Sequence, residues 1–380
     1  MTAVSSLTRR GAASLPPASS ARAPHPTRRT GAFTSPAARR RWWLVFGVVC
    51  AIAVLACVGL LVWKNPAQFA TPVFWRLARR RAFAVVAICL VAACQGMATV
   101  AFQTVANNRI ITPSILGFES LYRAIHTSTI FFLGVAGLNA SATVGNFVGQ
   151  LALMIVLTLV LYSWLLTSQR ASMHAMLLIG VMLGAGLGSV STFMQRLLTP
   201  SEFDVLTARL FGSIANAQKE YYPIAVPLVA VAATALVLMS RHLSVLSLGR
   251  ETATNLGVNH RAASVAVLVL VSILMATSTA LVGPMTFLGF LVATLAYQFS
   301  STHDHRYLFA MSTALGIAIL SSAYFFMNHV FNTQGVVSII IEFVGGLAFI
   351  ITILRKGCLS SPSIPSSNNT RRRCASGQFP

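Results

Sequence analysis

Acidic side chains are scarce in this chain. Its 380 residues include seven Asp and Glu against 28 Lys and Arg, and charged residues make up only 9% of the total. The few carboxylates are scattered, so the sequence offers no pair for general acid and base catalysis, and neither GxSxG nor HExxH occurs. These absences argue against an enzyme.

Lysine and paired cysteine are also missing where cofactor chemistry would need them. The only lysines are Lys64, Lys219 and Lys356, and none lies in the GxxxxGKS or GxxxxGKT loop that binds nucleotide phosphates. The six cysteines form no CxxC pair, and His303-Asp304-His305 is better explained as a solvated turn than as a metal site. We therefore expect no metal and no cofactor on this chain, and any ATP to be hydrolysed by another chain.

Apolar sequence, by contrast, is abundant. Hydrophobic residues make up 56% of the chain, in about ten stretches that each approach the ~20 residues of a bilayer-spanning helix. Lipid offers the backbone no hydrogen-bond partner, and the stretches lack the alternation of barrel strands, so an all-α polytopic membrane protein is predicted. The expected spans are 42–63, 82–105, 114–134, 145–166, 173–196, 222–240, 261–281, 284–300, 306–329 and 335–354.

Basic residues predict the orientation of the bundle. Short cytoplasmic loops retain Lys and Arg. Arg39, Arg40 and Arg41 precede the first span, and Arg355 and Lys356 follow the last one. With ten spans, both termini are therefore expected in the cytoplasm.

The two ends of the chain differ in composition from the spans. Residues 1–41 are rich in Ser, Ala, Pro and Arg, which predicts a disordered basic tail, although an organelle transit peptide or a downstream start codon would also account for it. A transmembrane domain, 42–356, and a polar tail, 357–380, follow. Much of the net charge of +21 lies in the tails, and few carboxylates offset it, so we expect membrane lipid and no nucleic acid as a partner.

One cluster of arginines departs from the orientation rule. Arg76, Arg79, Arg80 and Arg81 crowd the entry to the second span, on the face expected to be external. Three explanations stay open: a topology shifted by one helix, side chains that snorkel to lipid headgroups, or a use outside the membrane.

The fifth span carries a stripe of small residues and a polar patch. Gly180, Gly184 and Gly188 recur every four residues, which predicts a seam for close helix packing. The patch comprises Ser189, Ser191, Thr192 and Gln195. Because lipid penalises unpaired polar groups, such a patch suits the wall of a water-filled translocation path.

Two spans contain ionisable residues. Glu119 and Arg123 are one helical turn apart in the third span and are expected to neutralise each other. Glu342 has no neighbour of opposite charge in the sequence, so it must face another helix, a cavity or a partner subunit.

A stretch between the sixth and seventh spans predicts a docking element. Residues 246–258 read LSLGRETATNLGV, a short amphipathic sequence flanked by Arg241, His242, His260 and Arg261. An interfacial helix that lies on the lipid headgroups is the alternative.

Several ordered motifs resemble permeases of bacterial iron-siderophore ABC importers, the family that includes the vitamin B12 importer. The resemblance covers about residues 45–356, and the iron-chelate subgroup is closest. The motifs are FQTVANNRIITPSILGF at 102–118, LFGSI at 210–214, LSLGRE at 246–251, LVGPMTFLG at 281–289, DHR at 304–306 and QGVV at 334–337.

The resemblance implies the partners and the position of the protein. Members of this family work in the bacterial plasma membrane, where two permease subunits form the path for a ferric siderophore. Two ATPase subunits bind ATP and Mg underneath, and an extracytoplasmic protein delivers the cargo. The second permease is either an identical copy or, as in much of this subgroup, a different chain.

The resemblance also assigns roles to residues. It places a coupling helix for the ATPase at 246–258, with Leu248, Gly249, Arg250, Glu251, Leu256 and Gly257 as its main residues. It gives Arg81, with Arg76, Arg79 and Arg80 nearby, a role in docking the binding protein. Where the family has another arginine, before the last external loop, this chain has Asn328 and His329.

Two other classes of protein are weighed against this assignment. An ion-coupled secondary transporter of a small organic solute would need intramembrane carboxylates, for which Glu119 and Glu342 are too few. A membrane-embedded enzyme would need catalytic residues clustered at one depth, and none are found.

Overall fold

A computed structural model describes residues 32–33, 35–63, 71–114, 117–140, 143–167, 173–300, 302–329 and 337–359. All regular secondary structure in these ranges is helical, which confirms the all-α class. The α-helices are α1 (Pro36–Val62), α2 (Pro72–Val105), α3 (Phe118–Ala140), α4 (Val144–Thr167), α5 (Met173–Arg196), α6 (Pro200–Leu210), α7 (Tyr222–Leu238), α8 (Ser240–Leu246), α9 (Arg250–Asn255), α10 (His260–Val282), α11 (Leu288–Phe299), α12 (His305–His329) and α13 (Val337–Leu359). Two 3-10 helices, η2 (Ile214–Asn216) and η3 (Lys219–Tyr221), precede α7.

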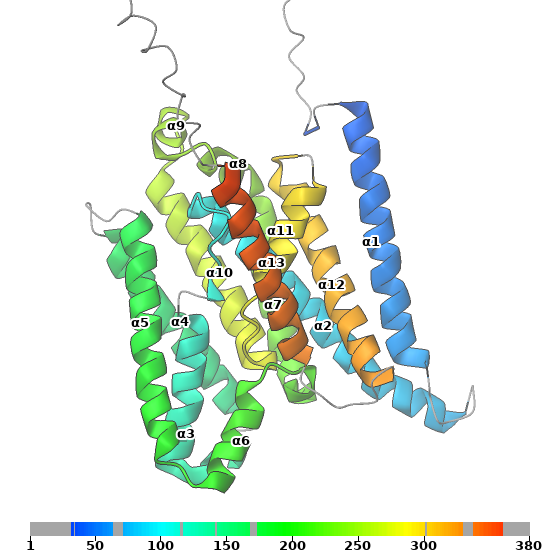
Figure 1. Ribbon diagram of the computed structural model, residues 1–380, viewed down its shortest axis with the longest axis vertical. Helices are drawn as coiled ribbons and strands as arrows, with labels where there is room; N and C mark the ends of the chain where they lie inside the picture. Colours follow the sequence, from blue (N-terminus) through cyan, green and yellow to red (C-terminus); the bar gives the residue numbers. More distant parts are fainter. Residues whose placement is uncertain are drawn as a thin grey trace, which may run out of the picture.

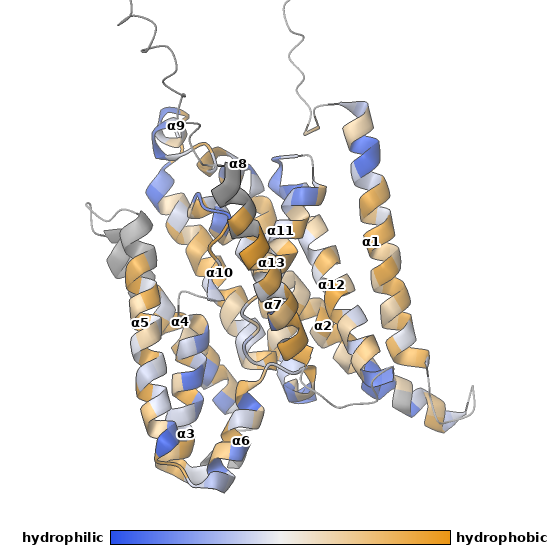
Figure 2. Ribbon diagram, in the orientation of Figure 1, coloured by the Kyte–Doolittle hydropathy of each residue, from blue (hydrophilic) through white to orange (hydrophobic). Residues whose placement is uncertain are grey.

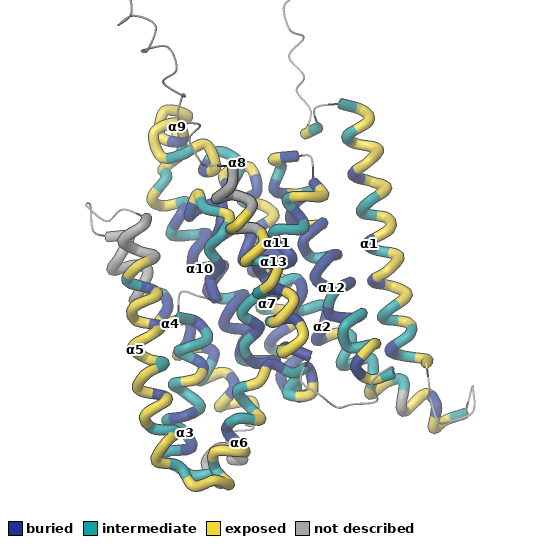
Figure 3. The backbone as a smooth tube through the Cα atoms, viewed as in Figure 1, coloured by how far each residue is buried: buried dark blue, intermediate teal, exposed yellow. Residues whose placement is uncertain are grey.

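The long helices run up and down through one bundle (Figure 1). Helices α2, α10 and α12 form its centre, where α2 packs against both of the others. Helices α1 and α5 lie at the two sides and are mostly exposed (Figure 3). The start of α1 and the end of α13 lie at the same end of the bundle as α8 and α9, and α6 lies at the opposite end.

Six helices are long and apolar enough to cross a membrane within the described ranges. They are Pro36–Val62, Pro72–Val105, Leu178–Arg196, Lys219–Leu238, His260–Val282 and His305–His329, and Val144–Val160, Leu288–Phe299 and Val337–Ile351 are apolar but shorter. Apolar residues dominate the middle of the bundle, and hydrophilic residues gather towards its ends (Figure 2). The chain is therefore a multi-pass membrane protein.

Every one of the ten predicted stretches contains a helix, but several boundaries differ from the prediction. α1 begins at Pro36, because Ser35 caps it through the amide of Ala38 at 3.1 Å and proline suits the first helical position. α2 begins at Pro72, ten residues before the predicted start, behind a Thr71 cap. Of the predicted tails 1–41 and 357–380, residues 1–31, 34 and 360–380 lie outside the described residues, whereas 36–41 are helical in α1 and 357–359 are helical in α13.

Three α-helices, α6, α8 and α9, lie outside the predicted spans except for the first residue of α8. α8 and α9 form at one end of the bundle, and α6 forms at the other end. At the start of α6 the carboxylate of Glu202 accepts two hydrogen bonds from Thr199, one from the hydroxyl at 2.8 Å and one from the backbone amide at 3.0 Å. These bonds lower the pKa of the exposed Glu202 carboxyl. The capping box accounts for the start of α6, whereas α8 and α9 begin without a side-chain cap, and a search for long apolar runs detects none of the three.

Candidate functional site

The predicted coupling stretch forms a tip that projects from one end of the bundle (Figure 1). We define the tip as residues 247–257, the turn after α8, helix α9 and the turn that follows it. α8 anchors the tip, because Leu243 and Leu246 are fully buried in the same cluster as α10 and α12. Within α9 only Ala253 is buried.

Two glycines set the shape of the tip. Gly249 has φ +94° just before α9, and Gly257 has φ +80° just after it, a region that residues with a Cβ rarely occupy. The chain therefore reverses sharply on both sides of a six-residue helix. These turns present Leu248 and Leu256, each 59% exposed, together with the exposed Arg250 and Glu251. Two leucines exposed beside charged groups at a polar end of the bundle are typical of a protein contact.

A buried histidine links the base of the tip to the bundle. The Nδ1 atom of His305 lies 3.0 Å from the Ser244 hydroxyl in α8, and Nε2 lies 2.8 Å from the Thr104 hydroxyl at the end of α2. Next to it, Arg306 donates from Nε to the hydroxyl of Ser240 at 3.2 Å. Polar contacts thus tie α8 to α2 and α12. The sequence placed His305 in a solvated turn, which is wrong for this side chain, because it is buried between α2 and α8.

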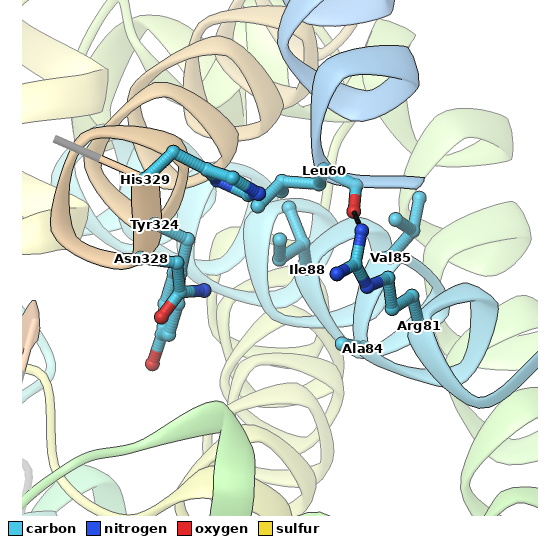
Figure 4. A pocket seen from close by; sticks show the side chains of 8 residues that line it. All are labelled: Leu60, Arg81, Ala84, Val85, Ile88, Tyr324, Asn328 and His329. Carbon is cyan, nitrogen blue, oxygen red and sulfur yellow. Dashed lines mark hydrogen bonds between the residues drawn. The ribbon is translucent and has the colours of Figure 1, made fainter. Parts of the chain in front are cut away.

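The arginine cluster lies at the opposite end of the bundle, and Arg81 borders a pocket of about 440 Å³ there. Its guanidinium donates from Nη1 to the carbonyls of Leu60, Leu61 and Trp63 at 3.3, 3.4 and 3.0 Å, so it caps the end of α1. Tyr324, Asn328 and His329 of α12 line the same pocket (Figure 4).

The structure thus brings together two parts of the predicted docking region that are far apart in sequence. His329 reaches the carbonyl of Trp63 through Nε2 at 3.1 Å, next to the Arg81 contacts. Arg79 and Arg80 are exposed on α2, and the Nε of Arg76 donates to Pro72 within the same helix at 3.4 Å. Docking of a binding protein by these arginines stays a prediction. The structure shows a separate role for Arg81, which joins α2 to the end of α1.

The polar patch of the fifth span lies partly along a hollow. We define the α5 hollow as the pocket of about 430 Å³ lined by Arg123, Ala185, Gly188, Ser189, Thr192, Phe193 and Arg196. Ser189 and Thr192 border it, whereas Ser191 is buried on another side of the helix. Gln195 instead bonds to the Thr127 hydroxyl of α3 at 3.1 Å.

The glycine stripe has two different environments. Gly184 lies against the backbone of Gly117, since a Cβ at Gly184 would lie 3.2 Å from the Gly117 Cα, and the carbonyl of Gly180 lies beside the same residue. Gly188 has no such neighbour within 4 Å and borders the α5 hollow. The close approach of α5 to α3 is therefore confined to the first part of the stripe.

Glu119 and Arg123, which are expected to neutralise each other, lie within electrostatic range, but no hydrogen bond joins them. The Oε2 of Glu119 accepts a 2.5 Å bond from Thr286, and its Oε1 has no hydrogen-bond partner. Arg123 instead lines the α5 hollow. Within the described residues no group of three His, Cys, Asp or Glu side chains could hold a metal ion.

Together these features define a helical membrane transport subunit: an apolar bundle with a polar hollow along one helix, and a projecting tip of the kind that binds a partner. The chain belongs to the FecCD transport family, whose model matches residues 43–355. It is a transport subunit rather than an enzyme, which confirms the resemblance and the predicted division of labour.

Relatives and a solved structure agree with this assignment. The chain is 49% identical to the petrobactin import system permease protein FatC of Bacillus anthracis over 88% of this chain and 94% of that protein. It is 36% identical to the permease protein YclO of Bacillus subtilis (strain 168), also of a petrobactin import system, over 80% and 94%. The fold matches a solved metal-chelate type ABC transporter in an inward-facing conformation, with TM-score 0.68 and 20% identity over 82% of this chain and 99% of the other.

Proposed function

We propose that this chain is the permease subunit of an ATP-driven importer that moves a ferric siderophore across the bacterial plasma membrane. Membership of the FecCD transport family is the observation that carries this proposal. The projecting tip supports it, because a subunit without a nucleotide-binding loop needs a contact through which another chain supplies energy. The alternative function, an ion-coupled secondary transporter, accounts neither for the projecting tip nor for the match to the FecCD family.

Ferric petrobactin is the cargo that the relatives favour. FatC and YclO, the relatives at 49% and 36% identity, are both described as permease proteins of petrobactin import systems. The chain spans 94% of each of them, so the likeness extends over the whole transport domain.

The second permease is a different chain in this proposal. Bacillus anthracis has FatC and a second petrobactin import permease, FatD, and this chain is 49% identical to the first but only 26% identical to the second. A FatD-like partner would complete a heterodimer. ATPase subunits that bind ATP and Mg, and an extracytoplasmic binding protein, would complete the transporter.

The proposed topology has ten spans with both termini in the cytoplasm. The six candidate spans, the three shorter apolar helices and α3 account for the ten stretches. This arrangement places the tip on the cytoplasmic side, where ATP is available, and the pocket bordered by Arg81 at the end of α1 on the outer side.

The geometry suggests how nucleotide binding acts on the bundle. An ATPase that binds Leu248 and Leu256 moves the tip as the nucleotide closes its subunits. Because Leu243 and Leu246 of α8 are buried and Ser244 bonds to His305, α8 moves with the start of α12 and the end of α2. Two central helices would thus transmit the motion towards the path.

The double substitution of Leu248 and Leu256 by serine tests the coupling contact. Burying a leucine side chain contributes about 1.5–3 kcal/mol, so the two changes should lower ATPase stimulation by loaded binding protein at least about tenfold. His242→Ala, exposed on α8 outside the tip, is the control and should keep its stimulation. Full stimulation in the leucine variant would contradict the coupling assignment.

A further inference from the structure

Arg123 lies at an unusual place for an arginine. Contacts at Gly117–Gly184 and at Thr127–Gln195 show that α3 and α5 run side by side in the same direction, and Arg123 falls between these two contacts along α3. In the proposed topology this is within the depth of the membrane. A charged side chain at that depth usually faces a path or a partner, because lipid does not solvate it.

The α5 hollow has two guanidinium groups on its wall. Arg123 comes from α3 and Arg196 from the last turn of α5, and both side chains are exposed in the isolated chain. The hollow is lined by no carboxylate within the described residues. Glu119 and Glu342 lie within electrostatic range of Arg123 from α3 and α13, but the Glu119 carboxylate accepts its hydrogen bond from Thr286.

The hydroxyl groups along the hollow already donate their hydrogen bonds within α5. Ser189 donates to the carbonyl of Ala185 at 2.9 Å, and Thr192 donates to that of Gly188 at 2.9 Å, so both hydroxyl hydrogens are already used. The guanidinium groups therefore supply the N–H donors that can face a ligand. Guanidinium forks bind the oxygens of anions through paired, charge-assisted hydrogen bonds.

We propose that the α5 hollow is a contact site for a ferric chelate with net negative charge, and that Arg123 and Arg196 favour such a cargo during passage. The inference rests on the proposed function and adds a charge preference to it. A volume of about 430 Å³ admits one part of a chelate rather than the whole molecule. The exposed position of both arginines suits a transient contact, since a transport site must also release what it binds.

The test uses the complete transporter, with this permease, its partner permease, the ATPase and the binding protein, in liposomes. Initial uptake of radioactive ferric petrobactin is measured beside ATPase stimulation by the loaded binding protein. The double variant Arg123→Gln, Arg196→Gln should lose at least about tenfold in uptake, because it removes both charged donors that would bind the anion. ATPase stimulation should stay within about twofold of the unsubstituted protein, since neither residue lies in the tip or at the Arg81 pocket.

Two further variants separate charge from shape. Arg123→Lys, Arg196→Lys keeps both charges and should restore at least about half of the uptake. Arg40→Gln removes an exposed arginine of α1 far from the hollow and should transport normally. If the double variant does not assemble, the single glutamine variants replace it, each with a smaller loss.

Three results would overturn the inference: normal uptake in the glutamine variants, a lysine variant as poor as the glutamine variant, or a loss of ATPase stimulation that matches the loss of uptake. Failure of the unsubstituted transporter to move any ferric siderophore would instead overturn the proposed function. The two failures are therefore distinguishable.

Discussion

At the scale of residues, close backbone contacts hold together motifs that are distant in sequence. The motif at 210–214 lies against the motif at 281–289: the amide of Ser213 donates to the carbonyl of Val282 at 2.9 Å, and the amide of Ile214 donates to the hydroxyl of Tyr324 at 2.7 Å. The space between the two motifs at Gly212 admits no side chain, because a Cβ there would meet the carbonyl oxygen of Pro284.

Gly212→Ala should therefore destabilise the bundle. Overpacking costs about 1–3 kcal/mol, and here the opposing atom belongs to the backbone and cannot rotate away. Thermal unfolding in detergent should show a lower midpoint for Gly212→Ala. Gly186→Ala, where no atom lies within 4 Å, should unfold at the normal temperature, and equal midpoints for the two variants would contradict this prediction.

At the scale of elements, the sequence predicted the long helices well and the short ones poorly. Apolar runs located ten helices because burial in lipid requires a sustained pattern. α6 begins with a capping box and α9 lies between two glycine turns, and such local signals act over only a few residues. α8 is only seven residues long and has no side-chain cap. The coupling stretch was found through the resemblance of its residues to a family, whereas the α5 hollow depends on Arg123 and Arg196 meeting across two helices and could not be read from spacing.

The end of α1 offers a prediction that separates a structural role from docking. Arg81→Gln removes three bonds to α1 carbonyls and should lower the thermal unfolding midpoint in detergent, since an unpaired carbonyl costs about 1–3 kcal/mol. The double variant Arg79→Glu, Arg80→Glu should leave that midpoint unchanged and weaken binding-protein docking, most clearly at low salt. If this double variant binds the binding protein as well as the unsubstituted permease does, the docking role predicted for Arg79 and Arg80 is wrong.

At the scale of the whole molecule, the two ends of the bundle carry different candidate binding features. The tip and the beginning of α1 lie at one end, and α6 and the Arg81 pocket lie at the other. In the proposed function, energy input at the tip and cargo delivery at the Arg81 pocket would therefore be separated by the full length of the helices.

Labelling of single cysteines tests this polarity. Ser247→Cys in the tip and Ser201→Cys in α6, each in a variant that lacks the six native cysteines, should lie on opposite sides of the membrane. An impermeant maleimide added to whole cells should modify only the cysteine at position 201. After lysis it should modify the cysteines at both positions. Modification of both residues in intact cells would refute the proposed orientation.

The first helix is hydrogen-bonded at its two ends, and one of its faces packs against α12 between them. The indole of Trp42 donates to Ser300 at 3.3 Å, and the carbonyl of Trp63 accepts from Arg81 at the far end. These anchors are 21 residues apart, or about 32 Å of helix, close to the ~30 Å hydrocarbon thickness of a typical bilayer. A thinner or thicker membrane is therefore expected to tilt α1 or to strain these two hydrogen bonds, and the lipid chain length should then affect the packing of α1 on the bundle.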